Sequence, residues 1–554
     1  MDNKNIEIKQ ILSLAIENHK KNNFKLAEDL YNKILIKDSS HFQSLFLLGT
    51  LFSQIKNYNK SITLLNKAIQ IQPNHANSYH NLGSALTELG EFNKAIKILK
   101  KVIQIDPKHA DAYYNLGNAY KQIRDFKNAK MHYEKAIQLL PKNPKALNNL
   151  GNVQKELGDL KGAIQTYKKS IQIQPNHARS FHNLGNIYKQ LGEFEKAKES
   201  YYQAFNYQPS NLETLDTLCV LDEKILDLNL KKKIKEIMSL KNITKKDIAY
   251  GNFLLGKYEL QQKNFDVEFE YLLKGHSNYF DFKKKAFQIG VKYWLNDLPR
   301  IEELMNYGQK VDKKNENKFR PIFIVGVPRC GSTLIEKVIA SGSQNVSIGE
   351  ETAIISLLVG EEITTKGFFK PDIENFKKKI IERYEEKKLL KKENNYFFTD
   401  KTLDNFFFIG IIKEIFPLAK IINCKRSSTS SIISILKNNL GDVCWAHNLD
   451  HIFKFFDNYH KTIGRFKKIF PNSIYDLNFE NFVQNPEFES KKLMKFCELP
   501  WDKKCLEFYK RKDLISSTAS NIQIRKAIYK DEVKKNIPYK EFLIGHGKKY
   551  VWFD

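Results

Sequence analysis

A residue pattern with a constant period fills the first third of the chain. Glycine recurs every 34 residues, at Gly49, Gly83, Gly117, Gly151 and Gly185. In most copies an alanine follows 12 residues after the glycine and a proline 24 residues after it, as Ala95 and Pro107 follow Gly83. Small residues at fixed positions allow two helices to approach closely, and a repeated helix pair buries its apolar side only by stacking on its neighbours. This pattern predicts an array of stacked helix pairs.

The period, the small residues and the proline together resemble the tetratricopeptide repeat. About six copies span residues 8–211, which predicts an all-α superhelix with a concave inner face. Residues 212–319 read as a helical connector, in which residues 248–279 keep the apolar spacing of a weaker copy. A polar stretch near residues 311–319 predicts a domain boundary.

An asparagine recurs two residues before the glycine in four copies, at Asn81, Asn115, Asn149 and Asn183. On a concave face, such a ladder of carboxamides could bind the backbone of an extended peptide, as in the repeats of protein O-linked N-acetylglucosamine transferase, which it resembles. The alternative is that these side chains form hydrogen bonds between repeats, or simply reflect an Asn-rich composition. The sequence leaves both interpretations open.

A second region, from Arg320 to Thr352, has the order strand, turn and helix. Residues 321–327 are apolar and β-branched, residues 328–333 have small side chains, and residues 334–340 have helical apolar spacing. Gly326 and Gly331 have the spacing of a phosphate-binding loop, but Ser332 stands where a Walker A motif has lysine. Because that lysine serves the β- and γ-phosphates of a triphosphate, the loop suits a 5′-phosphate that carries another transferable group.

The sequence P-R-C-G-S-T-L after an apolar strand, followed by G-E-E-T, resembles sulfotransferases that use 3′-phosphoadenosine 5′-phosphosulfate. It is most similar to the tyrosylprotein sulfotransferase branch and to bacterial fusions of such a domain with tetratricopeptide repeats. The resemblance implies a P-loop-like α/β domain with a mostly parallel sheet over residues 320–554. It also implies that Arg329, Cys330, Gly331, Ser332 and Thr333 bind the 5′-phosphosulfate.

Two further groups complete the implied active site. Matching G-E-E-T of the tyrosylprotein branch makes Glu351 the base that accepts the acceptor's proton, whereas matching the bacterial fusions makes it Glu350. A carboxylate within hydrogen-bond reach of the acceptor hydroxyl suffices for this step. Lys401 follows a predicted strand, where an ammonium group can neutralise charge that develops in the transition state. Arg329 is assigned the same role.

The 3′-phosphate of the nucleotide is assigned, by resemblance, to Arg426 after a strand and Ser434 eight residues later. Arginine supplies a forked charged donor and serine a hydroxyl group. Arg525 and Lys526 are candidates to close over the nucleotide. The chain departs from its relatives at Ser427, at Phe479 in place of tyrosine, and at Ala527 in place of proline.

Composition sets broad limits on the class of protein. The chain has 554 residues, 42% of them hydrophobic, and a formal net charge of +27, which fits globular domains and an anionic ligand. Six cysteines show no metal-ligand spacing, and neither a signal peptide nor a membrane span is apparent. We expect a cytoplasmic protein with no nucleic-acid partner and no metal.

The resemblance therefore implies a sulfotransferase that acts on a hydroxyl group. It points, with the asparagine ladder, to a protein or peptide tyrosine bound by the repeats as the acceptor, and a glycan, a lipid or a small phenol stays open. One alternative is another phosphate-loop transferase such as a kinase, against which the missing Walker lysine argues. The other is a binding scaffold whose transferase half is inactive. The sequence does not determine the acceptor or the oligomeric state.

Overall fold

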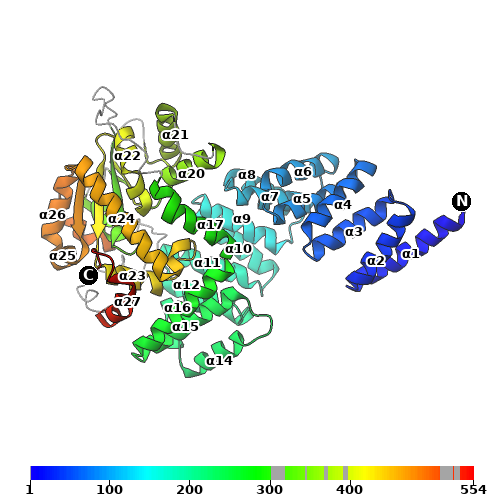
Figure 1. Ribbon diagram of the computed structural model, residues 1–554, viewed down its shortest axis with the longest axis horizontal. Helices are drawn as coiled ribbons and strands as arrows, with labels where there is room; N and C mark the ends of the chain where they lie inside the picture. The colour runs from blue at the N-terminus through cyan, green and yellow to red at the C-terminus, as the bar shows by residue number, and fades with distance from the viewer. Residues whose placement is uncertain are drawn as a thin grey trace. The chain divides into compact units, whose positions relative to one another are not determined.

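The computed structural model describes residues 2–300, 319–342, 346–366, 372–390, 397–511, 528 and 537–553 (Figure 1). The chain divides into two compact units. Residues 1–189 with 194–208 form the first, and residues 190–193 with 209–554 form the second.

The first unit is a series of helix pairs, as the 34-residue period predicts. The pairs are α1 (Asp2–Lys20) with α2 (Phe24–Lys37), α3 (Phe42–Gln54) with α4 (Tyr58–Ile71), α5 (Ala76–Glu88) with α6 (Phe92–Ile105), α7 (Ala110–Gln122) with α8 (Phe126–Leu139), α9 (Pro144–Glu156) with α10 (Leu160–Ile173), and α11 (Ala178–Leu191) with α12 (Phe194–Tyr207). Successive first helices α3, α5, α7 and α9 also contact one another, so the first helices join neighbouring repeats. The predicted all-α repeat array is confirmed.

Each repeat glycine lies where the second helix presses a large side chain against the first. A Cβ atom on Gly151 would lie 2.5 Å from the ring of Tyr167, and the same relation links Gly185 with Tyr201. The Tyr167 ring is fully buried, and its hydroxyl donates to Asn152 Oδ1 at 2.6 Å. Glycine is required here because a side chain would collide with the Tyr167 ring, which is held in place by burial and by the hydrogen bond of its hydroxyl group.

We expect Gly151→Ala to lower the free energy of unfolding of the first unit by about 1–3 kcal/mol, because overpacking displaces a fixed ring. Chemical denaturation of the full chain would measure this in the transition of the repeats. Gly464→Ala is the matched control, because Gly464 is exposed with nothing within 4 Å of an added Cβ. An unchanged repeat transition in Gly151→Ala would contradict this account of the glycine.

The second unit begins with a helical connector. Its elements are α13 (Leu212–Leu221), η1 (Glu223–Ile225), α14 (Leu228–Met238), α15 (Lys245–Gln261), α16 (Phe265–Phe282), α17 (Lys284–Lys292) and the π-helical turn η2 (Tyr293–Asp297). Helices α15 and α16 pack against each other along their lengths, in the region where the sequence suggests a weaker repeat.

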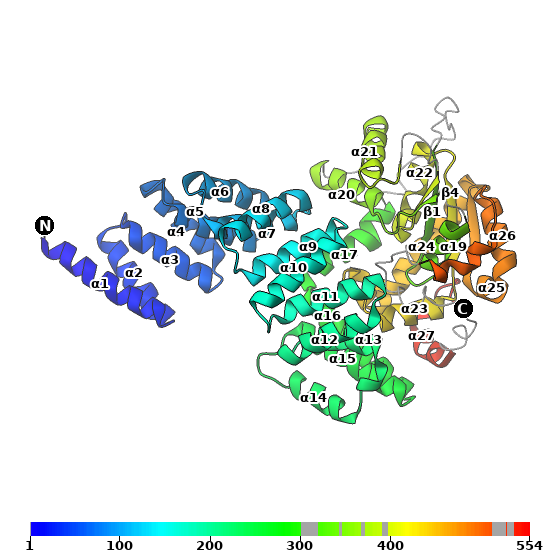
Figure 2. The same cartoon turned by 180° about the vertical axis from the view of Figure 1, so that it is seen from behind.

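A five-stranded sheet with the order β2-β3-β1-β4-β5 follows, and every paired strand is parallel. Figure 2 labels two of its strands, β1 and β4. The strands are β1 (Arg320–Gly326), β2 (Val346–Ser347), β3 (Phe397–Asp400), β4 (Lys420–Lys425) and β5 (Ile474–Asn478). The loops after β1, β3, β4 and β5 therefore all emerge at one edge of the sheet, where α/β proteins of this type bind ligands. The predicted fold class is confirmed.

Helices cover the sheet and fix which residues reach that edge. They are α19 (Ser332–Gly342), α20 (Ile354–Lys366), α21 (Ile373–Glu386), α22 (Ile409–Ile415), α23 (Ser428–Lys437), α24 (Leu449–Ile469), α25 (Phe479–Gln484), α26 (Pro486–Phe496) and α27 (Lys540–Gly547), with 3₁₀ turns η3 (Leu403–Phe408), η4 (Cys444–His447), η5 (Lys503–Lys510) and η7 (Ile537–Tyr539). The connection from β1 to β2, which contains α19, crosses the sheet in the opposite direction to the connection from β3 to β4, which contains α22. Because crossovers between parallel strands are right-handed, α19 and α22 cover opposite faces of the sheet. Tyr384, Phe398 and Phe416 pack together in the core on the face of α22.

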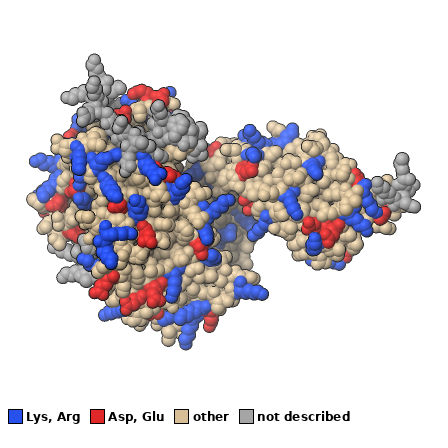
Figure 3. All heavy atoms as spheres, in the orientation of Figure 1, with Lys and Arg blue, Asp and Glu red and all other residues tan. Residues whose placement is uncertain are grey.

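Charge is distributed rather than gathered on the visible surface. Lys and Arg side chains lie over the whole face in Figure 3, with Asp and Glu among them. Among the residues that the structure describes, no helix is both long enough and apolar enough to cross a membrane.

Candidate active site

The loop between β1 and α19 has the backbone of a tight anion-binding turn. Arg329 and Gly331 both have positive φ, at 70° and 94°. Helix α19 begins at Ser332, and the side chains of Ser332 and Thr333 are nearly buried beneath the loop. Because a helix N-terminus presents unpaired N–H groups and the positive end of the helix dipole, this turn suits a phosphate or sulfate group.

Cys330 lies in the same loop, but its side chain does not face the loop opening. The thiol is fully buried, and its sulfur lies 2.9 Å from the position that a Cβ on Gly326 would occupy. All six cysteines lie within the described residues as buried thiols without disulfides. A contact between Cys330 and a ligand would therefore come from its backbone rather than its sulfur.

Phe479, at the start of α25, directly follows β5 and packs on this loop. A Cβ on Gly331 would lie 2.2 Å from its ring, and the ring also lies under the guanidinium of Arg426 at 4.8 Å. Arg426 donates to the backbone oxygen of Arg329 at 3.2 Å. The Phe479 ring thus positions Arg426 against the loop by a cation–π contact.

The loop also contacts helix α23. Arg329 Nε donates to Ser434 Oγ at 2.9 Å, and Asn438 Nδ2 donates to the Ser434 backbone oxygen at 2.7 Å. The structure therefore brings together the predicted residues of the two nucleotide subsites, Arg329 on one side and Arg426 and Ser434 on the other. These residues lie about a hundred positions apart in the chain.

Glu351 and Lys401 form an ion pair beside the loop. Lys401 Nζ donates to Glu351 Oε1 at 2.8 Å. The Lys401 side chain is 1% exposed and the Glu351 side chain 53% exposed. Burial lowers the pKa of Lys401, but the carboxylates of Glu351 and Glu336 more than offset this, so its pKa lies above the ordinary value. Lys401 is consequently a buried, charged ammonium group, and its partner, the Glu351 carboxylate, lies at the surface.

Glu350 is held differently from its neighbour. Its φ is +52°, its N–H donates to Glu336 Oε1 at 3.0 Å, and its backbone oxygen accepts from the Lys401 N–H at 2.7 Å. Its carboxylate lies 3.4 Å from the buried ammonium of Lys337. Glu350 therefore lies in a strained turn. Its backbone is held by the N–H of Lys401, directly after β3, and its carboxylate points to Lys337 on α19.

Sequence reasoning missed Glu336 and Lys337 as parts of this site. Both are almost fully buried on α19, and burial raises the pKa of Glu336. Adjacent opposite charges inside an apolar helix just after a phosphate loop were the available signal, since buried charges are rare unless paired.

The asparagine ladder joins neighbouring repeats. Asn115 Nδ2 donates to Ser84 Oγ at 2.9 Å and Asn149 Nδ2 to Asn118 Oδ1 at 3.0 Å, each in the preceding repeat. Asn81 and Asn183 likewise donate to Thr50 and Asn148 of the preceding repeat. All four side chains are half-buried. The N–H groups of these asparagines thus form hydrogen bonds between repeats, which is one of the two interpretations that the sequence left open.

Two predicted cofactor ligands, Arg525 and Lys526, lie outside the described residues. Within the described ranges, His, Cys, Asp and Glu side chains form no group of three that could hold a metal ion.

The structure joins a helical repeat array to a parallel α/β domain with a phosphate-type loop. Residues 321–503 match the sulfotransferase family. Residues 42–75, 64–97, 83–123, 110–143 and 143–210 match tetratricopeptide repeat families. These matches support the predicted fusion of tetratricopeptide repeats with a C-terminal domain similar to the sulfotransferase family.

Similar proteins extend this comparison. An uncharacterized protein from Aquifex aeolicus (strain VF5) is 28% identical over 335 residues, which are 56% of this chain and 42% of the relative. The chain thus matches about two fifths of that relative's length. The crystal structure of MamA is 28% identical with a TM-score of 0.28, covering 30% of this chain and 96% of that one. YrrB, described as a TPR protein with an unusual peptide-binding site, is 20% identical with a TM-score of 0.30, covering 34% and 96%.

Proposed function

We propose that this chain transfers a sulfuryl group from 3′-phosphoadenosine 5′-phosphosulfate to a hydroxyl group. The observation that supports this most is the contact between Arg329 and Ser434 at 2.9 Å. It brings a phosphate-type loop and a second cation-and-hydroxyl site to one edge of the sheet, which suits a nucleotide with phosphates at both its 5′ and 3′ positions.

The donor set fits this nucleotide. The N-terminus of α19, with Ser332 and Thr333, would hold the 5′-phosphosulfate, and Arg426 with Ser434 would hold the 3′-phosphate. Gly331 keeps the loop free of a side chain where Phe479 packs. The bound donor supplies the sulfuryl group, and the protein supplies charge and orientation.

We assign the general base to Glu351. Its carboxylate is half exposed, so an acceptor hydroxyl can approach it and lose its proton to a carboxylate oxygen. Lys401 lies 2.8 Å away, and Lys401 and Arg329 are placed to offset the negative charge that develops during transfer. Glu350 is the weaker candidate, because its carboxylate is directed to Lys337.

The acceptor we propose is a tyrosine hydroxyl on a protein or peptide bound by the repeats. The resemblance to the tyrosylprotein branch supports this, as do the asparagines that recur along the first helices. Because the N–H groups of Asn115 and Asn149 bond to the preceding repeat, their carboxamide oxygens are the groups that peptide N–H donors would meet.

Calorimetric titration without Mg²⁺ tests the donor. We expect adenosine 3′,5′-bisphosphate to bind, and Arg426→Ala to weaken it by about 100-fold, since hydrogen bonds to charged groups contribute about 1.5–3 kcal/mol. Arg383→Ala is the matched control, because Arg383 is an exposed arginine on α21. No bisphosphate binding together with Mg²⁺-dependent ATP binding would indicate a kinase instead, and no binding of either would indicate a scaffold.

A further inference from the structure

The end of helix α23 is held by a histidine from the connector. His276, on α16, donates from Nε2 to the backbone oxygen of Leu436 at 2.8 Å, and its side chain is 1% exposed. The last carbonyl groups of a helix have no partner within the helix, so this bond satisfies one of them. The contact joins residues 160 positions apart, from the repeat-like pair to the sulfotransferase-family domain.

The hydrogen-bond pattern fixes the protons on this histidine and its neighbour. Because His276 Nε2 donates to a carbonyl, its Nδ1 in the neutral ring must accept. His447 Nδ1 lies 3.0 Å from it and is therefore the donor of that bond. Burial lowers the pKa of His276 to about 4 and of His447 to about 3, so both rings are neutral near pH 7. His447 is stacked against Tyr279 and Phe287, which fixes the orientation of the pair.

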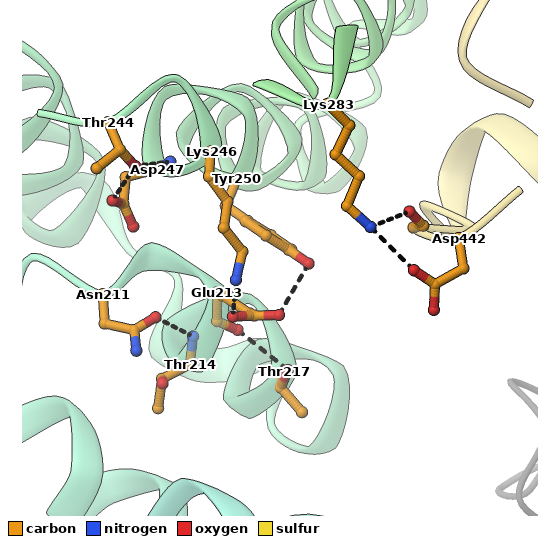
Figure 4. Close-up of polar contacts among 11 residues, drawn as sticks. Asn211, Glu213, Thr214, Thr217, Thr244, Lys246, Asp247, Tyr250, Lys283 and Asp442 are labelled. Atoms are coloured by element: carbon orange, nitrogen blue, oxygen red, sulfur yellow. Dashed lines mark hydrogen bonds and ion pairs between the residues drawn. The ribbon is translucent and has the colours of Figure 1, made fainter. Parts of the chain in front are cut away.

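Glu268 of α16, and Lys283 directly after this helix, hold the same end of α23 and the loop that follows it. Glu268, which is 1% exposed, lies 3.2 Å from Lys437 Nζ and accepts from the hydroxyl of Tyr539. Lys283 donates to the Gly441 backbone oxygen at 3.1 Å and to Asp442 Oδ1 at 2.9 Å (Figure 4).

Two other helices of the connector, α13 and α15, hold α16 in place. Glu213, on α13, binds Lys246 Nζ at 2.6 Å and the Tyr250 hydroxyl at 3.2 Å, both on α15 (Figure 4). The Tyr250 ring contacts the Tyr279 ring of α16 at right angles. Helix α16 is therefore packed between α15 and the end of α23.

We propose that His276 is a positioning residue for the 3′-phosphate subsite. Ser434 lies two residues before Leu436, and its hydroxyl accepts from Arg329. By holding the Leu436 carbonyl, His276 sets the place of Ser434 relative to the phosphate loop. This inference rests on the proposed function, because it assumes that Ser434 contacts the 3′-phosphate.

The test compares two nucleotides in the full-length chain. Adenosine 3′,5′-bisphosphate contains the 3′-phosphate, and adenosine 5′-monophosphate lacks it. We expect His276→Ala to weaken the bisphosphate about 10-fold and the monophosphate less than about 3-fold, given about 1.4 kcal/mol per tenfold change in affinity. His276→Gln should restore the wild-type ratio, because its amide N–H can donate to Leu436 and its oxygen can accept from His447.

The controls separate positioning from general damage to the fold. Lys274→Ala changes an exposed residue of the same helix and should leave both affinities unchanged. Should His276→Ala fail to fold, Glu268→Gln loosens the same helix end through Lys437 and should show the same selective loss. Equal losses for the two nucleotides, or none, would overturn the proposal. A wild-type chain that does not prefer the bisphosphate would instead overturn the proposed function.

Discussion

Glu351→Gln is expected to lower kcat by about 10²–10⁴-fold, the range that a positioned general base contributes. Glutamine keeps the size of the side chain and its contact with Lys401 but cannot take up the acceptor proton. Donor affinity should change little, because the nucleotide contacts we propose lie on the loop and on α23. Transfer of radiolabelled sulfate to a synthetic tyrosine peptide would measure the rate, and calorimetry with adenosine 3′,5′-bisphosphate the affinity.

Glu350→Gln is the matched control for this change. Glu350 contributes to the turn through its N–H and its backbone oxygen, both of which glutamine retains. We expect its kcat to remain within about fivefold of the wild-type value, because the lost carboxylate contact is with Lys337 rather than with the acceptor. The reverse result, a large loss in Glu350→Gln alone, would make Glu350 the base, the other assignment that the sequence left open.

Lys401→Met should lower kcat by about 10²–10³-fold, the usual effect of removing one preorganised donor from developing charge. The side chain is 1% exposed, so its ammonium acts in surroundings where charge is poorly screened by water. Removing it also leaves Glu351 without its partner at 2.8 Å. The rate would be followed in the same transfer assay, at saturating donor.

Lys413→Met separates this effect from the loss of any buried lysine. Lys413 Nζ donates to the backbone oxygen of Ala419 at 3.1 Å, and burial lowers its pKa to about 8. We expect this variant to lose stability but to keep the wild-type kcat. If Lys401→Met retained full activity, or if both variants lost it equally, the proposed role of Lys401 would be wrong.

Local pattern was sufficient for the elements around the site. The predicted strand at residues 321–327 and helix at residues 334–340 correspond to β1 (Arg320–Gly326) and α19 (Ser332–Gly342). Lys401 and Arg426 both follow strands, as expected from apolar runs that end at a charged residue. Glycine spacing likewise predicted the helix pairs of the repeats, because the constraint lies within a single pair.

Contacts between distant segments could not be predicted in this way. The asparagines read equally well as peptide ligands or as bonds between repeats, and only the stacking of the helices showed where their N–H groups point. The burial of Glu336 and Lys337 depends on the sheet that covers α19, which their helical spacing does not report.

By itself, the sequence determined the repeat array and the strand, turn and helix of the phosphate-type loop, because helical period, strand composition and glycine spacing act over short distances. The parallel α/β domain around that loop was an expectation from the resemblance to known sulfotransferases. Tertiary structure alone decided that Arg329 meets Ser434, that the carboxylate of Glu351 rather than that of Glu350 pairs with the Lys401 ammonium, and that His276 of the connector holds α23. Each of these contacts is a hydrogen bond shorter than 3 Å between segments that are distant in the chain. Only the packed fold brings such segments together, and a single contact of this kind produces no repeating residue pattern from which the sequence could predict it.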